Sequence, residues 1–338
     1  YEYRAKEWGR SRANLRFLWD TVSVLPLRFL IKRHLPSQSS IVMFSHYVKI
    51  TFRTLNRSKV YSAINVVGLA MGMGVCLLIY QYISFELSYD RFHANADHLY
   101  RVTQAELRDG ETLVRSSYTT FGLGPAIRQE VPDVQQMTRA HRQYEGLIMI
   151  NRERNIQHQE DEMWYVDSSF LEVFSFPLKY GDKRTALTDQ SSIVITAEMA
   201  TRYFGDEDPM GKALRVSGGT LSGDFLVTGV LEPLPVNTHL QFDFLLPVDF
   251  LLTHWRLYTE GDGWDWKNFV TYVTITPSAD ISKVAQKLDS VVDSHVGEYL
   301  NQSGVRWNMG LQLIDDIHLR SDFDRDIAKN NGQIETLY

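Results

Sequence analysis

Residues 60–85 read VYSAINVVGLAMGMGVCLLIYQYISF, a run of 26 residues without a charged side chain. A helix needs about 20 apolar residues to cross the roughly 30 Å hydrocarbon core of a bilayer, so this run can span with some tilt. The alternative is a buried core helix, but core helices of this length rarely lack every charge. A cleaved signal peptide is disfavoured because 59 residues, many of them basic, precede the run and no good cleavage site follows it. We therefore predict a transmembrane helix at 60–85.

The charge of the chain changes sign across this run. Residues 1–59 hold 12 Lys and Arg against 3 Asp and Glu, whereas residues 60–338 hold 23 against 38. Basic residues collect on the cytoplasmic side of spans, so we predict a cytoplasmic N-terminus and an acidic extracytoplasmic bulk. The overall net charge of −6 argues against a nucleic-acid binder. The single cysteine, Cys76, excludes an intramolecular disulfide framework and a cysteine-based zinc site.

Two glycines of the predicted span, Gly68 and Gly72, have the GxxxG spacing. Such a pair lets a second helix approach closely, which makes these residues candidates for helix packing. Glycine is common in spans, so an incidental occurrence stays open as the alternative.

A basic amphipathic helix is predicted at 44–59, directly before the span. Lys49, Arg53 and Arg57 follow one another at i, i+4 and i+8 and share one face, while apolar residues occupy the other. Next to a span, this pattern indicates a helix lying on the membrane surface and bound to lipid; an ordinary solvated face is the alternative. Residues 1–43 are interpreted as a cytoplasmic prefix, with a surface-lying or regulatory helix at 15–35.

The region after the span contains two β-α-β patterns. The first has a strand at 99–107, a helix at 123–130 and a strand near 136–150, with 147–150 (LIMI) as its most apolar part. The second has a strand at 268–276, a helix from residue 281 and a strand at 311–319.

Together the two patterns predict one split, ferredoxin-like α/β subdomain formed by residues 97–150 and 266–320. Two strands alone bury too little apolar surface to be stable. We expect Leu288, with Val284 and Val291, to pack against the sheet near Val102.

Residues 151–265 are predicted to form a β-rich insert that projects as a separate lobe. Its strand candidates are 163–166, 192–195, 225–230 and 242–247. One short helix is expected at 197–204, capped by Thr196 and ended by Gly205. The predicted fold class is thus α+β, with one transmembrane helix before a domain of two subdomains.

No pattern in the chain predicts catalysis. The stretch GDEDPMGKA (205–213) resembles a phosphate loop, but five residues separate its glycines and Ala213 stands where Ser or Thr would hold magnesium. His158 and the acidic residues 160–162 match no familiar metal site and are interpreted as a solvated loop. His318 is interpreted as a structural or surface histidine. We predict no catalytic, cofactor-binding or metal-binding residues and no enzyme activity.

Several separated stretches resemble MacB-like (MacB/FtsX-type) ABC transporter permeases. Residues 56–74 and 86–102 (ELSYDRFHANADHLYRV) resemble their first span and its exit segment. Residues 192–214 (SIVITAEMATRYFGDEDPMGKAL) resemble a recurrent part of their periplasmic core domain, and NTHLQFDFLLP (237–247) and LIDDIHLRSD (313–322) resemble later landmarks. The resemblance covers about 44–338. Residues 1–40 resemble, more weakly, the end of a prefix found in some permeases of Bacteroidota.

The resemblance implies that residues 86–338 form a periplasmic core domain attached to the inner membrane. It further implies a partner ABC ATPase in the cytoplasm, a second permease copy in a dimer, periplasmic or outer-membrane partners, and mechanotransmission in export or efflux. Permeases of this type have four spans, so the sequence is expected to be a fragment of a longer chain. The alternative is a single-span, membrane-anchored sensor or binding protein.

Overall fold

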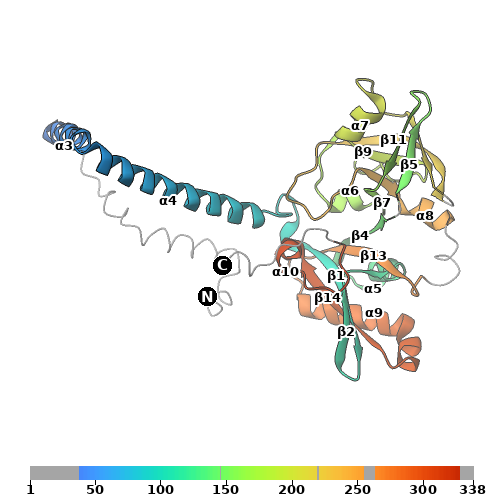
Figure 1. Cartoon of the computed structure of the whole chain (residues 1–338). Coiled ribbons are helices and arrows are strands. Elements are labelled where there is room, and N and C mark those ends of the chain that lie inside the picture. The colour runs from blue at the N-terminus through green and yellow to red at the C-terminus, as the bar shows by residue number, and fades with distance from the viewer. Residues whose placement is uncertain (1–37, 145, 219–220, 255–262, 328–338) are drawn as a thin grey trace. The chain divides into compact units, whose positions relative to one another are not determined.

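The computed structural model describes residues 38–144, 146–218, 221–254 and 263–327. The chain divides into two compact units, residues 1–78 and residues 79–338. The described part of the first unit is helical, whereas the second unit holds all the described strands (Figure 1). Residues 1–37, which include the predicted helix at 15–35 and most of the prefix, lie outside the described residues.

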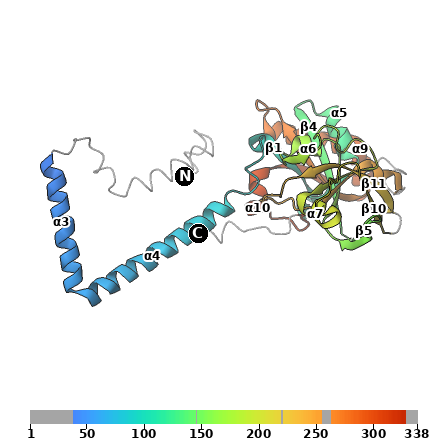
Figure 2. The same ribbon diagram turned by 90° about the horizontal axis from the view of Figure 1, so that it is seen from above.

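The first unit contains helix α3 (Gln38–Arg57) and most of helix α4 (Lys59–Glu86), which appear at the blue end of the chain in Figure 2. Only Ser58 separates the two helices, and its amide donates to the Thr54 carbonyl at 3.3 Å. No residue of α4 is buried. Among the described residues, α4 is the one helix long and apolar enough to cross a membrane. Its 28 residues correspond to about 42 Å at 1.5 Å per residue.

The second unit begins with the last turns of α4 and contains an antiparallel group of four strands. Their spatial order is β14 (Arg306–Leu313), β1 (Leu99–Arg108), β13 (Lys267–Ile275) and β4 (Val134–Gln143). The first strands of the two β-α-β patterns, β1 and β13, are the central pair. The second strand of the first pattern, β4, pairs with β13, and the second strand of the second pattern, β14, pairs with β1. This is the split, ferredoxin-like arrangement that the sequence predicts, and the α+β fold class is confirmed.

Two helices cover one face of these four strands. Helix α5 (Leu123–Glu130) and helix α9 (Ile281–Gln302) contribute to one apolar core together with β1, β4, β13 and β14. Leu288 is fully buried in that core, in the same cluster as Val102, as expected. Helix α9 begins where the Asp280 carboxylate accepts a hydrogen bond from the Ser282 amide at 3.0 Å, a regular N-cap.

The remaining strands continue the same sheet beyond β4. In spatial order they are β7 (Met163–Val166), β12 (Phe244–Pro247), β9 (Ser192–Thr196), β11 (Gly223–Leu231), β10 (Ala213–Ser217), β5 (Leu147–Asn151) and β6 (Ile156–Glu160). The pairs β7–β12 and β9–β11 are parallel, while the other pairs along this path are antiparallel.

The insert is nevertheless connected to the α/β half through strand pairing. Strand β7 pairs with β4, with Ala140 opposite Val166, so one hydrogen-bonded path runs through both halves. A common apolar cluster also crosses the boundary, because it contains Leu99 and Tyr272 from one half and Trp164 from the other. Strand β4 thus serves both halves, because residues 134–140 pair with β13 and residues 140–143 pair with β7.

Three assignments from the sequence are corrected. Residues 147–150 belong to β5, which pairs with β6 and β10 in the insert and not with the α/β strands. The last strand ends at Leu313, and residues up to 320 form η5 (Ile314–Asp316) and α10 (Ile317–Arg320). The insert holds α6 (Phe170–Val173) and α8 (Val248–His254) besides the expected α7 (Ala197–Phe204). Apolar content predicts that a segment is buried, but it does not identify its partner strand.

Short elements complete the domain. They are η2 (Ala96–His98), β2 (Glu111–Ser116), which forms a hairpin with β1, β3 (Thr119–Thr120) and β8 (Leu178–Tyr180). The predicted helix signals at α7 are confirmed: the Thr196 side chain accepts from the Met199 amide, and the helix ends at Gly205 with φ of 63°. An L-residue with a side chain rarely adopts that angle, which explains the glycine.

Candidate functional site at the end of the apolar helix

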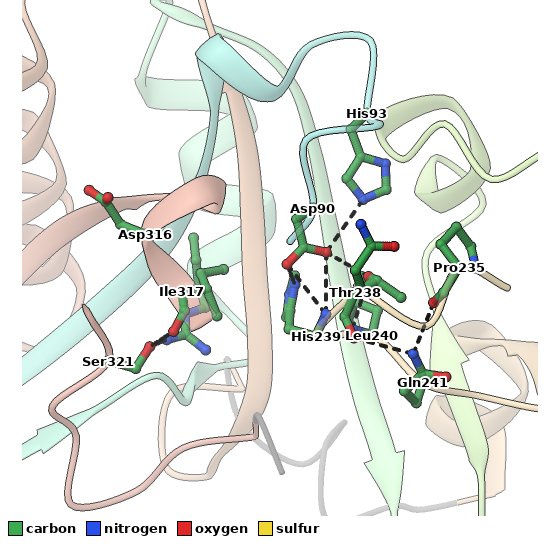
Figure 3. Close-up of polar contacts among 12 residues, drawn as sticks. Asp90, His93, Pro235, Thr238, His239, Leu240, Gln241, Asp316, Ile317 and Ser321 are labelled. Atoms are coloured by element: carbon green, nitrogen blue, oxygen red, sulfur yellow. Dashed lines mark hydrogen bonds and ion pairs between the residues drawn. The ribbon is translucent and has the colours of Figure 1, made fainter. Parts of the chain in front are cut away.

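Three segments that are far apart in the sequence meet where α4 ends. Residues 86–93 follow from the helix, residues 237–241 come from the loop between β11 and β12, and residues 315–321 include α10. We call this cluster the α4 junction. Figure 3 shows its polar contacts, with Asp90 facing Thr238 and His239. All of its residues lie in the second unit.

Asp90 is the centre of the α4 junction. Its carboxylate is completely buried and accepts hydrogen bonds from the Thr238 hydroxyl at 2.6 Å, from His239 Nδ1 at 2.8 Å and from the His239 amide at 3.3 Å. Burial raises the pKa of this carboxyl, but attraction to His239 and the hydrogen bonds from His239 and Thr238 outweigh burial, so the net pKa is lowered. The backbone of Asp90 has φ of 58°, a left-handed conformation that Asp tolerates better than most residues.

The His239 ring connects Asp90 to the sheet. Its Nε2 lies 2.8 Å from the hydroxyl of Tyr272, a fully buried residue of β13. With the proton on Nδ1, the ring donates to Asp90 and accepts from Tyr272, so both nitrogens are satisfied. Burial raises the pKa of Tyr272, which keeps the phenol protonated and able to donate.

Backbone contacts hold the same loop to the chain that leaves α4. The Asn237 side-chain amide donates to the Ser88 carbonyl at 3.1 Å and to the Ser88 hydroxyl at 2.9 Å. In return, the Asp90 amide donates to the Asn237 carbonyl at 2.9 Å. The two segments are thus joined by main chain as well as side chains.

His93 makes a second, less polar attachment. Its Nδ1 accepts from the Ser175 amide at 3.1 Å, and its ring packs against Phe92, Phe174 and Phe176. Burial lowers the pKa of His93 to about 4, and the attraction of Asp90, whose Oδ1 lies 3.9 Å from His93 Nε2, only partly opposes this. His93 is therefore neutral at physiological pH and serves as a hydrogen-bond acceptor.

The last turn of α4 itself contacts α10. Glu86 lies 2.7 Å from Nε2 of His318, and both side chains are largely buried. The ring of Tyr89 stacks on the same imidazole. Burial raises the pKa of Tyr89, with further contributions from the negative charges of Glu86 and Asp90. Arg91 adds an ion pair with Asp315 at 3.4 Å.

The residues after α10 are held against β1 and β2. The buried Arg101 guanidinium donates to the Asp326 carboxylate at 2.6 Å, to the Ser321 hydroxyl at 3.0 Å and to the side-chain Oε1 of Gln312 at 2.7 Å. The Asp324 carboxylate accepts from the Arg115 amide at 2.8 Å. Residues 321–326 thus pack on the same strand, β1, that follows the α4 junction in the chain.

The arrangement of the α4 junction suits attachment more than chemistry. Among the described residues, no group of three or more His, Cys, Asp or Glu side chains is placed to hold a metal ion. In the segment 158–162, Glu160 accepts from the Tyr203 hydroxyl at 2.6 Å and pairs with Arg202, and Glu162 pairs with Arg142. The stretch 205–213 is a turn in which Gly211 has φ of 72° and Lys212 pairs with Glu207.

The structure does not gather the sequence-predicted site residues into the α4 junction. Lys49, Arg53 and Arg57 are exposed on α3. At Gly68 and Gly72 of α4, a built Cβ atom would meet no neighbour within 4 Å, so the space beside the helix is open. Their roles at the membrane surface and in helix packing stay predictions.

Sequence reasoning missed the junction residues Asp90, His93 and His239, and it interpreted His318 only as a structural or surface histidine. A signal was nevertheless present. The segments 86–102, 237–247 and 313–322 are three of the stretches on which the family resemblance rests, and each supplies one part of the α4 junction. Their convergence depends on pairing across 148 and 232 positions, which a single sequence does not specify.

Comparison with known proteins gives one family and several similar folds. The profile described as MacB-like periplasmic core domain matches residues 62–291, more than half of the chain. No protein with a curated description matches. A domain described as part of a permease protein from Porphyromonas gingivalis has 26% sequence identity and a TM-score of 0.56, and the match covers 66% of this chain and 92% of that one.

Two other solved structures resemble the chain more distantly. The periplasmic region of MacB from Actinobacillus actinomycetemcomitans has 13% identity and a TM-score of 0.45, with 66% of this chain and 91% of that chain covered. The extracellular domain of the noncanonic ABC-type transporter YknZ from Gram-positive bacteria has 13% identity and a TM-score of 0.41, with 63% and 99% covered.

Proposed function

The chain belongs to the MacB-like periplasmic core domain family of ABC transporter permeases, and from this premise we propose that it transmits movement from the membrane to the periplasm. In this proposal, α4 is a transmembrane helix of the inner membrane. A cytoplasmic ABC ATPase moves the span when it binds and hydrolyses ATP, and the periplasmic domain follows. The protein is a transporter component and not an enzyme in the usual sense.

The observation that supports this proposal is the set of buried contacts at the α4 junction. Flexible linkers would absorb a movement of the helix, but here the chain leaves α4 directly into a buried cluster in which the Asp90 carboxylate accepts hydrogen bonds from Thr238 and His239. Glu86 and Tyr89 are fixed to His318 at the same time. Because Tyr272 lies on β13, a displacement of α4 reaches the centre of the sheet through two contacts, Asp90 to His239 and His239 to Tyr272.

A flexible insertion tests the coupling. Gly-Gly-Ser placed between Leu87 and Ser88 separates α4 from the contacts of Ser88, Tyr89 and Asp90, whereas the same insertion at Gly110, in the exposed turn between β1 and β2, is the matched control. The assembled permease and its ATPase are reconstituted in vesicles, with spin labels on the periplasmic domains. We expect ATP to change the label distances in the control but not in the junction variant, while ATP hydrolysis continues in both. Equal distance changes in both would reject the proposal.

Partners follow from the same proposal. We expect a second permease copy, with Gly68 and Gly72 available for close helix packing because their surroundings are open. The exposed Lys49, Arg53 and Arg57 face of α3 is expected to bind anionic lipid headgroups at the cytoplasmic surface. Other periplasmic or outer-membrane proteins would receive the movement.

The orientation is tested with single cysteines in a Cys76→Ser background. A cysteine at Glu111, exposed in β2, should react with a membrane-impermeant maleimide in cells with a permeabilised outer membrane. A cysteine at Lys49, exposed in α3, should react only after the inner membrane is opened. The opposite pattern would reverse the topology.

A further inference from the structure

We propose that the loop of residues 233–236 lies in the outer leaflet of the membrane beside the end of α4, with the Val236 side chain in contact with lipid. The inference rests on the proposed function, because it requires α4 to span the membrane. It adds a second membrane contact to the periplasmic domain, made by a segment about 150 residues away from the helix in the sequence.

The position of the loop carries the argument. Asn237, the residue after Val236, donates two hydrogen bonds to Ser88, which follows the last residue of α4 by only two positions. The charge-free run of α4 has 26 residues, about 39 Å at 1.5 Å per residue. This exceeds the roughly 30 Å hydrocarbon core and reaches into the headgroup layer. Ser88, and with it the loop, is therefore placed at the outer boundary of the bilayer.

Two exposed side chains at this place are apolar. Val236 is 74% exposed, the largest exposed fraction of any large apolar side chain among the described residues after α4. Leu87, next to Ser88, is 43% exposed. Single exposed apolar residues are common on protein surfaces, but these two lie beside an apolar helix, where lipid would cover them.

The backbone of the loop also suits a medium of low polarity. Pro233 and Pro235 have no N–H group, so they leave no unsatisfied donor there. The Pro235 carbonyl accepts from the Gln241 side-chain amide at 3.2 Å, a contact that Figure 3 shows as a dashed line. Burial of an unpaired polar group is costly, and these features remove several such groups from the loop.

Polar groups at the ends of the loop limit its depth. Glu232 is exposed, and its amide donates to the Pro177 carbonyl at 2.9 Å, which holds the start of the loop on the protein. Arg91, close to the junction, is also exposed. Charged side chains remain at the headgroup level, so the geometry points to interfacial contact of Val236 and not to deep insertion.

The experiment uses the full chain in phosphatidylcholine vesicles with a single environment-sensitive fluorophore. One variant carries Val236→Cys in a Cys76→Ser background, and the matched control carries Leu226→Cys, an apolar residue of β11 that is 50% exposed. The native Cys76, labelled in the unchanged chain, reports on the span. We expect nitroxide lipids to quench the label at 236 and at 76, and aqueous iodide to quench the label at 226.

Three results separate the possible failures. If iodide quenches the label at 236 as strongly as at 226 while Cys76 is lipid-quenched, the span stands and the loop inference is overturned. If neither quencher reaches position 236, protein and not lipid covers the side chain, and the inference is again overturned. If nitroxide lipids do not quench the label at Cys76, the span itself fails, and the proposed function fails with it.

Discussion

The imidazole of His318 lies parallel to the phenol ring of Tyr89, with 3.4 Å between the ring centroids and 3° between the ring planes. Tyr89 comes three residues after the end of α4, whereas His318 belongs to α10 near the end of the described chain. The stack therefore joins the segment that leaves the apolar helix to α10, the last of the described helices. Glu86, 2.7 Å from Nε2 of the same ring, fixes the orientation of the imidazole.

This stack predicts a measurable coupling between the two side chains. In a double-mutant cycle with Tyr89→Leu and His318→Leu, we expect a coupling free energy of about 0.5–1.5 kcal/mol, the range found for aromatic pairs. Thermal unfolding of the full chain in detergent micelles measures it. Strictly additive effects would mean that the stack contributes nothing to stability.

Asp90 is predicted to be one of the most sensitive residues of the domain. Asp90→Ala leaves the buried Thr238 hydroxyl and the His239 ring without their acceptor, and each buried donor left without a partner costs about 1–3 kcal/mol. Asp224→Ala, which breaks a surface pair with Arg215, should change stability by only about 0.5 kcal/mol. Urea unfolding of both variants compares them, and similar losses would contradict the central role of Asp90.

His93 predicts a loss of stability in acid. Its pKa is lowered from 6.5 to about 4 by burial, so between these values the unfolded chain binds a proton that the folded chain does not. The contribution of neutral His93 to the free energy of unfolding is complete above pH 6.5. It is lost as the pH falls toward 4, which lowers the free energy of unfolding by up to about 3 kcal/mol. His93→Gln keeps an acceptor but does not titrate. The difference in unfolding free energy between wild type and this variant should therefore shrink below pH 6.5.

The raised pKa of Asp243 predicts the opposite dependence of stability on pH. Burial and the neighbouring carboxylates of Glu160 and Glu198 raise its pKa from 3.8 to about 6. The folded chain thus holds a proton that the unfolded chain loses, and stability decreases as the pH rises from 3.8 through 6. Asp243→Asn should stabilise the protein at pH 7.5 by about 1 kcal/mol, after allowance for solvent screening at this half-buried site. If Asp243→Asn stabilises the protein no more at pH 7.5 than at pH 4, the raised pKa of Asp243 is refuted.

Leu288 tests the core of the α/β half. It is fully buried between α9 and the sheet, so Leu288→Ala should reduce the free energy of unfolding by about 2–5 kcal/mol. Tyr299→Ala, on the same helix but 66% exposed, is the control and should cost much less. The denaturant midpoint reports both changes, and equal shifts would show that helix propensity and not core packing is being measured.

The sequence predicts local structure of the domain better than its long-range pairing. Helix α5 has the predicted bounds, because an amphipathic pattern ends before Pro132, and α7 is delimited by Thr196 and Gly205. Residues 147–150 illustrate the limit: their apolar character correctly indicates a buried strand, but that strand pairs within the insert. Apolar periodicity is a local property, whereas strand pairing is decided by partners far along the chain.

The candidate site was less predictable for a related reason. Asp90, His239 and His318 are single polar residues in unremarkable local patterns, and none belongs to a recognisable catalytic motif. Their importance arises only when burial and mutual contact are known, since an Asp on the surface and an Asp that accepts three buried hydrogen bonds have the same local sequence signal. The family resemblance marked the right segments without indicating that they touch.

The pairing of β4 with β13 has a consequence for how such a domain could have arisen. Because the two strands are antiparallel neighbours, with Ala140 opposite Val270, the chain leaves β4 and returns in β13 at the same end of the sheet. A short hairpin turn would close that gap, so the residues between the strands are equivalent to an insertion into a single turn of an ancestral four-stranded module. The loop of residues 237–241 limits such changes, because it lies between the two strands and holds Ser88 and Asp90 at the end of the helix. Lineages could therefore enlarge or shorten other parts of the insert while this loop and the module stayed in place.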